Sequence, residues 1–280
     1  MGKIINGRKV AKDVLNRVKE QTAFLKERGI SPCLAVIIVG EDPASLVYVK
    51  NKQAACEKVG IISRRFSLPE STTEEELILL IKKLNADSSV HGILCQLPLP
   101  RHINEKSILR AIDEGKDVDG FSARIGFDRN DIAPCTPQGV IELLASENID
   151  IKGKNCVVLG RSNIVGKPMA LLLLLNDGTV TVCHSKTKNL IDITKRADIL
   201  VVAIGKPRFI TGDMVKNGVT VIDVGINRNA DGSLCGDVDF DSVEPKAEYI
   251  TKVPGGVGPM TIAMLMQNTI VAAMRSNAQN

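Results

Sequence analysis

The sequence predicts an α/β protein with two domains and largely parallel sheets. The chain has 280 residues, more than a single hydrophobic core usually holds, and this length favours two domains. Short apolar runs alternate with amphipathic segments, as is typical of parallel strands that helices cover on both faces. Residues 117–137 lack periodicity and contain two glycines and two prolines, which indicates a domain junction. We therefore expect a three-layer α/β domain at 1–120, completed by a last helix at 261–280, and a second domain at 121–260.

The individual elements follow from hydrophobic periodicity. Runs rich in β-branched residues and bounded by turn residues predict strands, and these fall at residues 34–39, 61–67, 92–96, 156–160, 180–183, 199–204 and 219–224. Apolar residues that recur every three or four positions predict helices, and these fall at residues 7–27, 45–59, 73–85, 104–112, 137–146, 167–175 and 261–274.

The composition excludes several classes of function. The formal charge is only +4 and aromatic residues are 3%, so the clustered basic surface that nucleic-acid binding needs is not indicated. The longest purely apolar run, residues 169–175, is too short to span a bilayer. The N-terminus lacks the apolar core of a signal peptide, and the seven cysteines form no C-x-x-C motif. We therefore expect a cytoplasmic protein that binds neither nucleic acid nor membranes.

The stretch CVVLGRSNIVGKPMALLLL reads as a strand, a turn and a helix. Gly160 ends the strand and Gly166 opens the helix, at positions where a dinucleotide-binding fold lets the backbone approach a pyrophosphate. The spacing departs from G-x-G-x-x-G at Ser162 and Val165, so an ordinary turn between strand and helix stays an alternative. The motif favours a Rossmann-like second domain.

The end of the next strand favours NADP over NAD. An NAD site usually has an Asp or Glu about 20 residues after the glycine turn, where the carboxylate binds the ribose hydroxyls. Here the strand ends in His184, Ser185, Lys186 and Thr187. A carboxylate would repel a 2′-phosphate, whereas hydroxyl and cationic donors, helped by Arg161, would bind it. A solvated turn is the alternative reading of this stretch.

Tyr48 and Lys52 stand four residues apart in a predicted helix and therefore share one face. On spacing alone, such a pair is usually a surface contact. Short-chain dehydrogenases also use Tyr-x-x-x-Lys, but their glycine turn precedes the pair, whereas Gly160 follows Tyr48 by 112 residues (160 − 48). The pair therefore belongs to a different domain from the nucleotide, and we expect the active site in the cleft between the domains.

Longer motifs extend this interpretation to a family. In chain order they are VGEDPASLVYVKNKQAACEKVGI, HGILCQLPLP, KDVDGF, PCTPQG, GRSNIVGKPM, VTVCHSKT and VPGGVGPMTIAMLMQNT. With them the chain resembles the bifunctional 5,10-methylenetetrahydrofolate dehydrogenase/cyclohydrolase family, from about residue 5 to residue 274. The resemblance implies oxidation of methylenetetrahydrofolate by NADP⁺ and hydrolysis of the methenyl product to 10-formyltetrahydrofolate. It also implies a folate-binding first domain, an NADP-binding second domain and a homodimer formed through the latter.

The resemblance implies a catalytic role for three residues of the first domain. Lys52 corresponds to the family's essential lysine, Gln96 to the glutamine that hydrogen-bonds it, and Tyr48 would pack on the folate ring and hold Lys52 through its hydroxyl. Water addition to the methenyl cation needs a base that receives a proton. Because the reference pKa of lysine is about 10.4, we expect burial of Lys52 without a carboxylate partner to lower its pKa.

The resemblance also implies binding residues. Asp119 would accept two parallel hydrogen bonds from the pterin edge, although a metal site with Asp117 or an ordinary Asx-turn stays open. Further substrate contacts are implied at Gln96, Leu97, Pro98, Gly256 and Pro259. Cofactor contacts are implied at Thr136, Gly160, Arg161, Ser162, Val165, Gly166, His184, Ser185 and Ile226.

Two other functions stay open. The chain could be a monofunctional NAD-dependent methylenetetrahydrofolate dehydrogenase, against which Ser185, Lys52 and Gln96 argue. It could also bind folate or nucleotide without catalysis, which the intact catalytic residues disfavour.

Overall fold

The structure is a computed structural model that describes residues 1–121 and 132–278, and these form two compact units. Unit 1 contains Met1–Lys12 and Thr136–Thr261. Unit 2 contains residues 13–121, 132–135 and 262–278. Residues 122–131 of the predicted junction at 117–137 lie outside the described residues.

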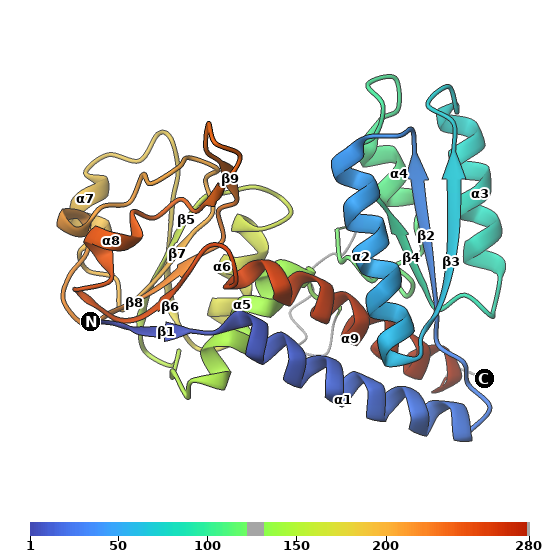
Figure 1. The fold of residues 1–280 in the computed structure, drawn as a ribbon, viewed down its shortest axis with the longest axis horizontal. Helices are drawn as coiled ribbons and strands as arrows, with labels where there is room; N and C mark the ends of the chain where they lie inside the picture. Colours follow the sequence, from blue (N-terminus) through green and yellow to red (C-terminus); the bar gives the residue numbers. More distant parts are fainter. Residues whose placement is uncertain (122–131, 279–280) are drawn as a thin grey trace. The chain divides into compact units, whose positions relative to one another are not determined.

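Unit 2 is a three-layer arrangement around a small parallel sheet. The strands pair in the order β3-β2-β4 and cover Cys33–Val39 (β2), Ile62–Leu68 (β3) and Gly92–Cys95 (β4). Helices lie on both faces (Figure 1), namely α2 (Pro43–Val59) on one and α3 (Glu74–Ala86) and α4 (Glu105–Ala111) on the other. Every residue of β2 is buried because both of its faces are covered. The predicted α/β class is therefore confirmed.

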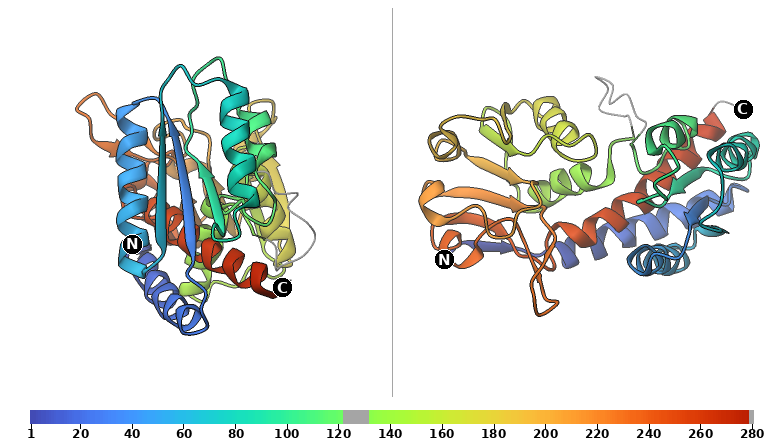
Figure 2. Two further views of the ribbon diagram at one scale, coloured as in Figure 1. Left: turned by 90° about the vertical axis from the view of Figure 1, so that its right-hand side faces the viewer. Right: turned by 90° about the horizontal axis from the view of Figure 1, so that it is seen from above.

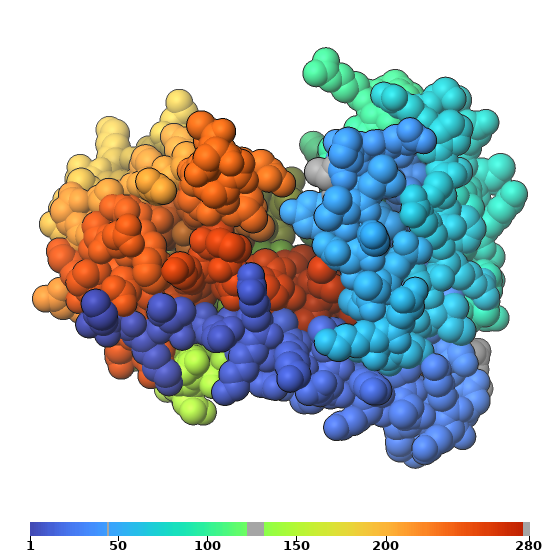
Figure 3. All heavy atoms as spheres, in the orientation of Figure 1, coloured from blue at the N-terminus to red at the C-terminus, as the bar shows by residue number. Residues whose placement is uncertain are grey.

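Two long helices supply further residues to unit 2. They are α1 (Gly7–Glu27), whose polar face is exposed along its length (Figure 3, dark blue), and α9 (Val257–Ala278). In unit 2 the Gln267 amide of α9 donates a 3.1 Å hydrogen bond to Gln21 of α1. By length and apolar character α9 could cross a membrane, but 61% of its apolar stretch is buried within the protein, as expected of a core helix.

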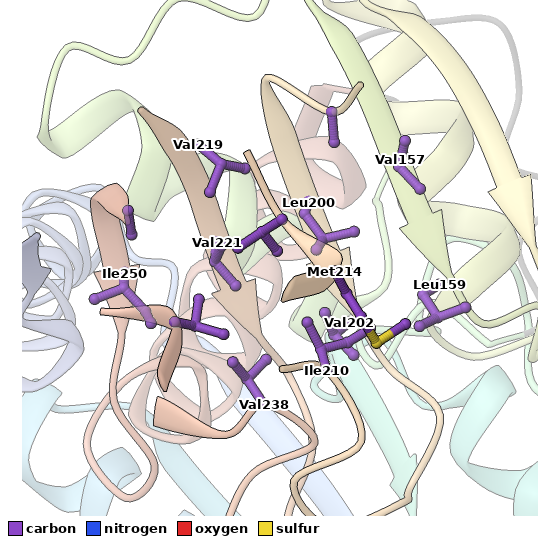
Figure 4. Packing of buried hydrophobic residues seen from close by; sticks show 14 of the residues in the cluster. Val157, Leu159, Leu200, Val202, Ile210, Met214, Val219, Val221, Val238 and Ile250 are labelled. Carbon is purple, nitrogen blue, oxygen red and sulfur yellow. The ribbon is translucent and has the colours of Figure 1, made fainter. Parts of the chain in front are cut away.

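Unit 1 is built on a six-stranded parallel sheet in the order β1-β11-β8-β7-β5-β6. The strands cover Lys3–Ile5 (β1), Asn155–Leu159 (β5), Thr179–Cys183 (β6), Ile199–Val202 (β7), Val219–Asp223 (β8) and Ala247–Thr251 (β11). The helices of this part are Cys135–Ser146 (α5), Gly166–Leu175 (α6), Leu190–Thr194 (α7), Phe240–Val243 (α8) and a 3₁₀ turn at Gly212–Met214 (η1). Aliphatic side chains of β5, β7 and β8 meet those of the following loops in one core (Figure 4).

The structure contains short helices and strands that the sequence did not predict, and the two short helices are α7 and α8. β1, which we expected in the first domain, pairs with β11 in the sheet of unit 1. Neither strand was predicted, because each is too short to show a periodic pattern, and β11 becomes a strand through its pairing with β8. The two-residue strands β9 (Asn227–Arg228) and β10 (Leu234–Cys235) form an antiparallel hairpin that projects from the sheet (Figure 2, orange).

Candidate active site

Lys52 and Gln96 meet in unit 2, where α2 packs beside the end of β4. The Lys52 side chain is only 8% exposed, and its Nζ donates a 3.0 Å hydrogen bond to Gln96 Oε1. The Gln96 amide is oriented by its own Nε2, which donates to the Leu97 carbonyl at 2.7 Å and leaves Oε1 for the lysine. In the described part of the chain Lys52 makes no ion pair. The amine is therefore buried and held by a neutral partner.

Tyr48 stands one helical turn before Lys52 but is placed differently. Its side chain is 48% exposed, and among the described residues its hydroxyl makes no hydrogen bond. The hydrogen bond of Lys52 goes to Gln96 and not to Tyr48. The exposed phenol ring can therefore stack on a flat ligand, which is the packing role expected of it.

Asp119 is a half-buried carboxyl close to Lys52. Burial raises the pKa of Asp119, while the Lys52 ammonium opposes this rise and the neighbouring Asp117 adds to it. Asp117 accepts a 3.0 Å hydrogen bond from the Gly120 amide, so an Asx-type turn does form here. Among the residues that the structure describes, no set of His, Cys, Asp and Glu side chains could hold a metal ion.

Two buried residues beside Asp119 were not predicted for this site. Asn268 of α9 donates through Nδ2 to the carbonyls of Val118 (2.9 Å) and Ala133 (3.0 Å). The Cys135 thiol donates to the Val118 carbonyl at 3.3 Å, and burial, followed by the Asp119 charge, raises the pKa of Cys135. The only sequence signal was an asparagine inside the apolar stretch MLMQNTIVAAM.

Unit 1 contains a cavity of about 460 Å³ at the carboxyl ends of β5, β6 and β7. This is the edge of a parallel sheet where nucleotides bind in doubly wound folds. The cavity is lined by Leu159, Gly160, Arg161, Ser162, His184, Ser185, Thr187, Leu190, Ala203, Ile204, Lys206 and Phe209. Five of the predicted cofactor residues are therefore brought together here, whereas Lys206 and Phe209 were missed because they lie beyond both motifs.

The glycine turn is required by backbone packing within unit 1. A Cβ at Gly160, whose φ is 130°, would lie 2.2 Å from the Ala203 carbonyl oxygen, and one at Gly166 would lie 2.4 Å from the Gly160 oxygen. Ser162 Oγ accepts hydrogen bonds from the Val165 and Gly166 amides at 3.1 and 3.2 Å. Ser162 thus stands at the position of the second glycine of the fingerprint and binds the two amides that lead into α6.

The stretch after β6 is a turn and also a wall of the cavity. The Thr187 amide donates to the His184 carbonyl at 2.9 Å, and the His184 amide donates to Thr187 Oγ1 at 2.8 Å. Ser185 is exposed at this turn and lines the cavity. A solvated turn and a wall of the cofactor cavity are therefore compatible interpretations of the stretch.

The remaining predicted residues lie outside the cavity. Within unit 1, Thr136 and Thr261 share a 2.9 Å hydroxyl contact, and Ile226 is exposed near Gly258. α9 begins at Val257, so Pro259 lies in its first turn, where the missing amide proton costs nothing, and only Gly256 remains in the preceding loop. In unit 2, Leu97 is half-buried and Pro98 exposed.

The fold and the cavity define a class of protein: a two-unit α/β enzyme with a Rossmann-like nucleotide site. Models of the tetrahydrofolate dehydrogenase/cyclohydrolase catalytic domain and NAD(P)-binding domain match residues 5–119 and 134–277. The chain belongs to this family.

Relatives and solved structures agree over nearly the whole length. The bifunctional protein FolD of Agathobacter rectalis is 60% identical over 279 residues, which is 98% of this chain and 100% of that protein. The crystal structure of the FolD enzyme of Campylobacter jejuni has a TM-score of 0.96 at 50% identity and covers 98% of this chain and 99% of its own. The Trypanosoma brucei FolD structure, complexed with NADP and an inhibitor, has a TM-score of 0.92 at 40% identity. The match covers 99% of this chain and 98% of that one.

Proposed function

We propose that the protein oxidises 5,10-methylenetetrahydrofolate to 5,10-methenyltetrahydrofolate with NADP⁺ and hydrolyses the product to 10-formyltetrahydrofolate. The observation that carries the proposal is the buried amine of Lys52, held 3.0 Å from the neutral Gln96 amide. This arrangement suits a lysine that exchanges a proton, because its direct hydrogen-bond partner is a neutral amide, whereas a carboxylate in that position would stabilise the charged form more strongly than the nearby Asp119 does. The cavity of unit 1 supplies the cofactor site.

The oxidation needs alignment more than acid or base. Bound NADP⁺ accepts a hydride from the methylene carbon, and the resulting cation is delocalised over the two flanking nitrogens. The protein therefore contributes by orienting the folate, with Tyr48 stacking on its ring and Asp119 accepting from the two-donor edge of the pterin. The backbone at Leu97 and Pro98 extends the folate site, and we assign Gly256, Pro259, Thr136 and Ile226 to further contacts with substrate or cofactor.

The hydrolysis uses Lys52 as base and acid. Water adds to the methenyl carbon, and one of its two protons passes to the Lys52 Nζ. When the bond from this carbon to N5 breaks, Lys52 returns that proton to N5, and the remaining hydroxyl proton leaves to solvent as the C=O bond of the formyl group forms, so that 10-formyltetrahydrofolate is released. Gln96 positions Nζ throughout, since its Oε1 accepts from the amine in either protonation state.

The NADP site lies at the cavity of unit 1. Gly160 and Gly166 permit the tight turn. Ser162 lies in this turn and Val165 is the N-cap of α6, whose positive end favours the pyrophosphate. Arg161, His184 and Ser185 line the cavity, and we assign them to the adenosine side of the cofactor.

We assign folate binding to residues 1–120 with the last helix at 261–280, and NADP binding to residues 121–260. The first twelve residues pack with the sheet of unit 1, so they serve the nucleotide domain structurally. A homodimer formed through this domain is supported by the edge strand β6, where Val182 is exposed. The seven cysteines are free and buried, which supports a cytoplasmic location.

One assay tests the proposed function. Purified protein is mixed with methylenetetrahydrofolate and either NADP⁺ or NAD⁺, and the absorbance of methenyltetrahydrofolate is followed. We expect rapid oxidation with NADP⁺, slower oxidation with NAD⁺, and decay of added methenyltetrahydrofolate above its uncatalysed rate. Oxidation with NAD⁺ alone and no accelerated decay would instead identify the monofunctional NAD-dependent enzyme.

A further inference from the structure

The loop after β7, residues 204–209, brings a second cation to the nucleotide cavity. Lys206 lines the cavity together with Arg161, and none of the lining residues is acidic. Within the described part of the chain, neither cation pairs with a carboxylate. Two unpaired cations in a cavity without acids indicate a site for a doubly charged anion.

A buried carboxylate fixes this loop. Asp237 is fully buried and accepts hydrogen bonds from the amides of Ile204 (2.7 Å), Gly205 (2.9 Å) and Lys206 (2.9 Å). The amide of Arg208 donates to the Gly236 carbonyl at 3.0 Å. The backbone that carries Lys206 is therefore held on both sides of the residue, so a ligand would find it already ordered.

The Lys206 side chain is also directed by its surroundings. Its Nζ lies 5.4 Å from the centre of the Phe209 ring, close enough for a cation–π contact, and Phe209 lines the same cavity. This contact costs little to rearrange because the side chain is exposed. An ammonium on a flexible stem can thus reach a phosphate from an ordered loop.

We propose that Lys206 is a specificity-determining residue that binds the 2′-phosphate of NADP jointly with Arg161 and Ser185. The pyrophosphate is met by the start of α6, after the turn from Gly160 to Gly166. Arg161 and Lys206 then remain for a phosphate monoester, whose charge of about −1.5 to −2 at pH 7 they balance. This inference rests on the proposed use of NADP.

The test compares the binding of NADP⁺ and NAD⁺ to the full chain by calorimetry. Lys206→Met removes one charge-assisted hydrogen bond, so we expect NADP⁺ to bind about tenfold more weakly and NAD⁺ to change by less than about twofold. Lys206→Arg keeps the charge and should retain most of the affinity. Lys188→Met is the matched control, since Lys188 is an exposed lysine near Ser185 that does not line the cavity, and it should leave both affinities unchanged.

The outcomes separate the inference from the function on which it rests. The double variant Arg161→Ala with Ser185→Ala gives the loss of NADP⁺ affinity expected for the other two residues proposed to bind the 2′-phosphate, and unchanged melting temperatures show that the variants are folded. Equal losses for NADP⁺ and NAD⁺ in Lys206→Met, or no loss for either, would overturn the role of Lys206. Failure of the unaltered protein to bind NADP⁺ would instead contradict the proposed function.

Discussion

Asp119, which we propose binds the pterin, has surroundings that disfavour its charged form. Burial raises its pKa above the ordinary value of 3.8, and the Lys52 ammonium counters part of that rise. A pterin edge that donates two hydrogen bonds requires the ionised carboxylate. Asp119, the acid that we propose binds the substrate, therefore takes up a proton more readily than a surface aspartate does.

Folate affinity should consequently depend on pH. As the pH falls through the raised pKa of Asp119, the carboxylate gains a proton and loses an acceptor, so binding of a folate analogue should weaken at a higher pH than for an ordinary aspartate. Binding measured by fluorescence between pH 7.5 and 5 tests this. In Asp119→Asn, binding should be weaker throughout and nearly independent of pH. The same pH dependence in both proteins would exclude Asp119 as its source.

At the scale of elements, long helices were predicted more reliably than short strands and short helices, since α7 and α8 were not predicted. The helix at 7–27 was predicted with its observed bounds, because its apolar residues recur at helical spacing and are buried. β11 has no such pattern, since pairing with β1 and β8 makes it a strand. Sequence separation likewise decides which site residues could be predicted. The Tyr48–Lys52 pair could be predicted because both residues lie in one helix. Asn268 could not, because its contact with Val118 spans 150 residues of chain.

α9 should stabilise the loop of Asp119 through that asparagine. Asn268→Ala removes the donor to two buried carbonyls, and we expect the free energy of unfolding to fall by about 2–3 kcal/mol in urea denaturation. Gln267→Ala on the same helix removes a partly exposed amide with one hydrogen bond and should cost under about 1 kcal/mol. Equal losses of unfolding free energy in the two variants would contradict a larger stabilising contribution from the Asn268 hydrogen bonds.

At the scale of the whole molecule, the two chemical tasks are assigned to separate units. The lysine and its amide partner lie in unit 2, and the nucleotide cavity lies in unit 1. Neither unit is one continuous segment, because the division falls within α1 and within α9. A change confined to the base should therefore leave cofactor binding intact.

The most direct measurement is the hydrolysis of methenyltetrahydrofolate by Lys52→Met, compared with the unaltered protein. Methionine keeps the apolar stem but cannot exchange a proton, so hydrolysis should fall to the uncatalysed rate while NADP⁺ binds with near-normal affinity. The melting temperature of the variant checks that it is folded. Hydrolysis at the unaltered rate in a folded Lys52→Met protein would contradict the mechanism.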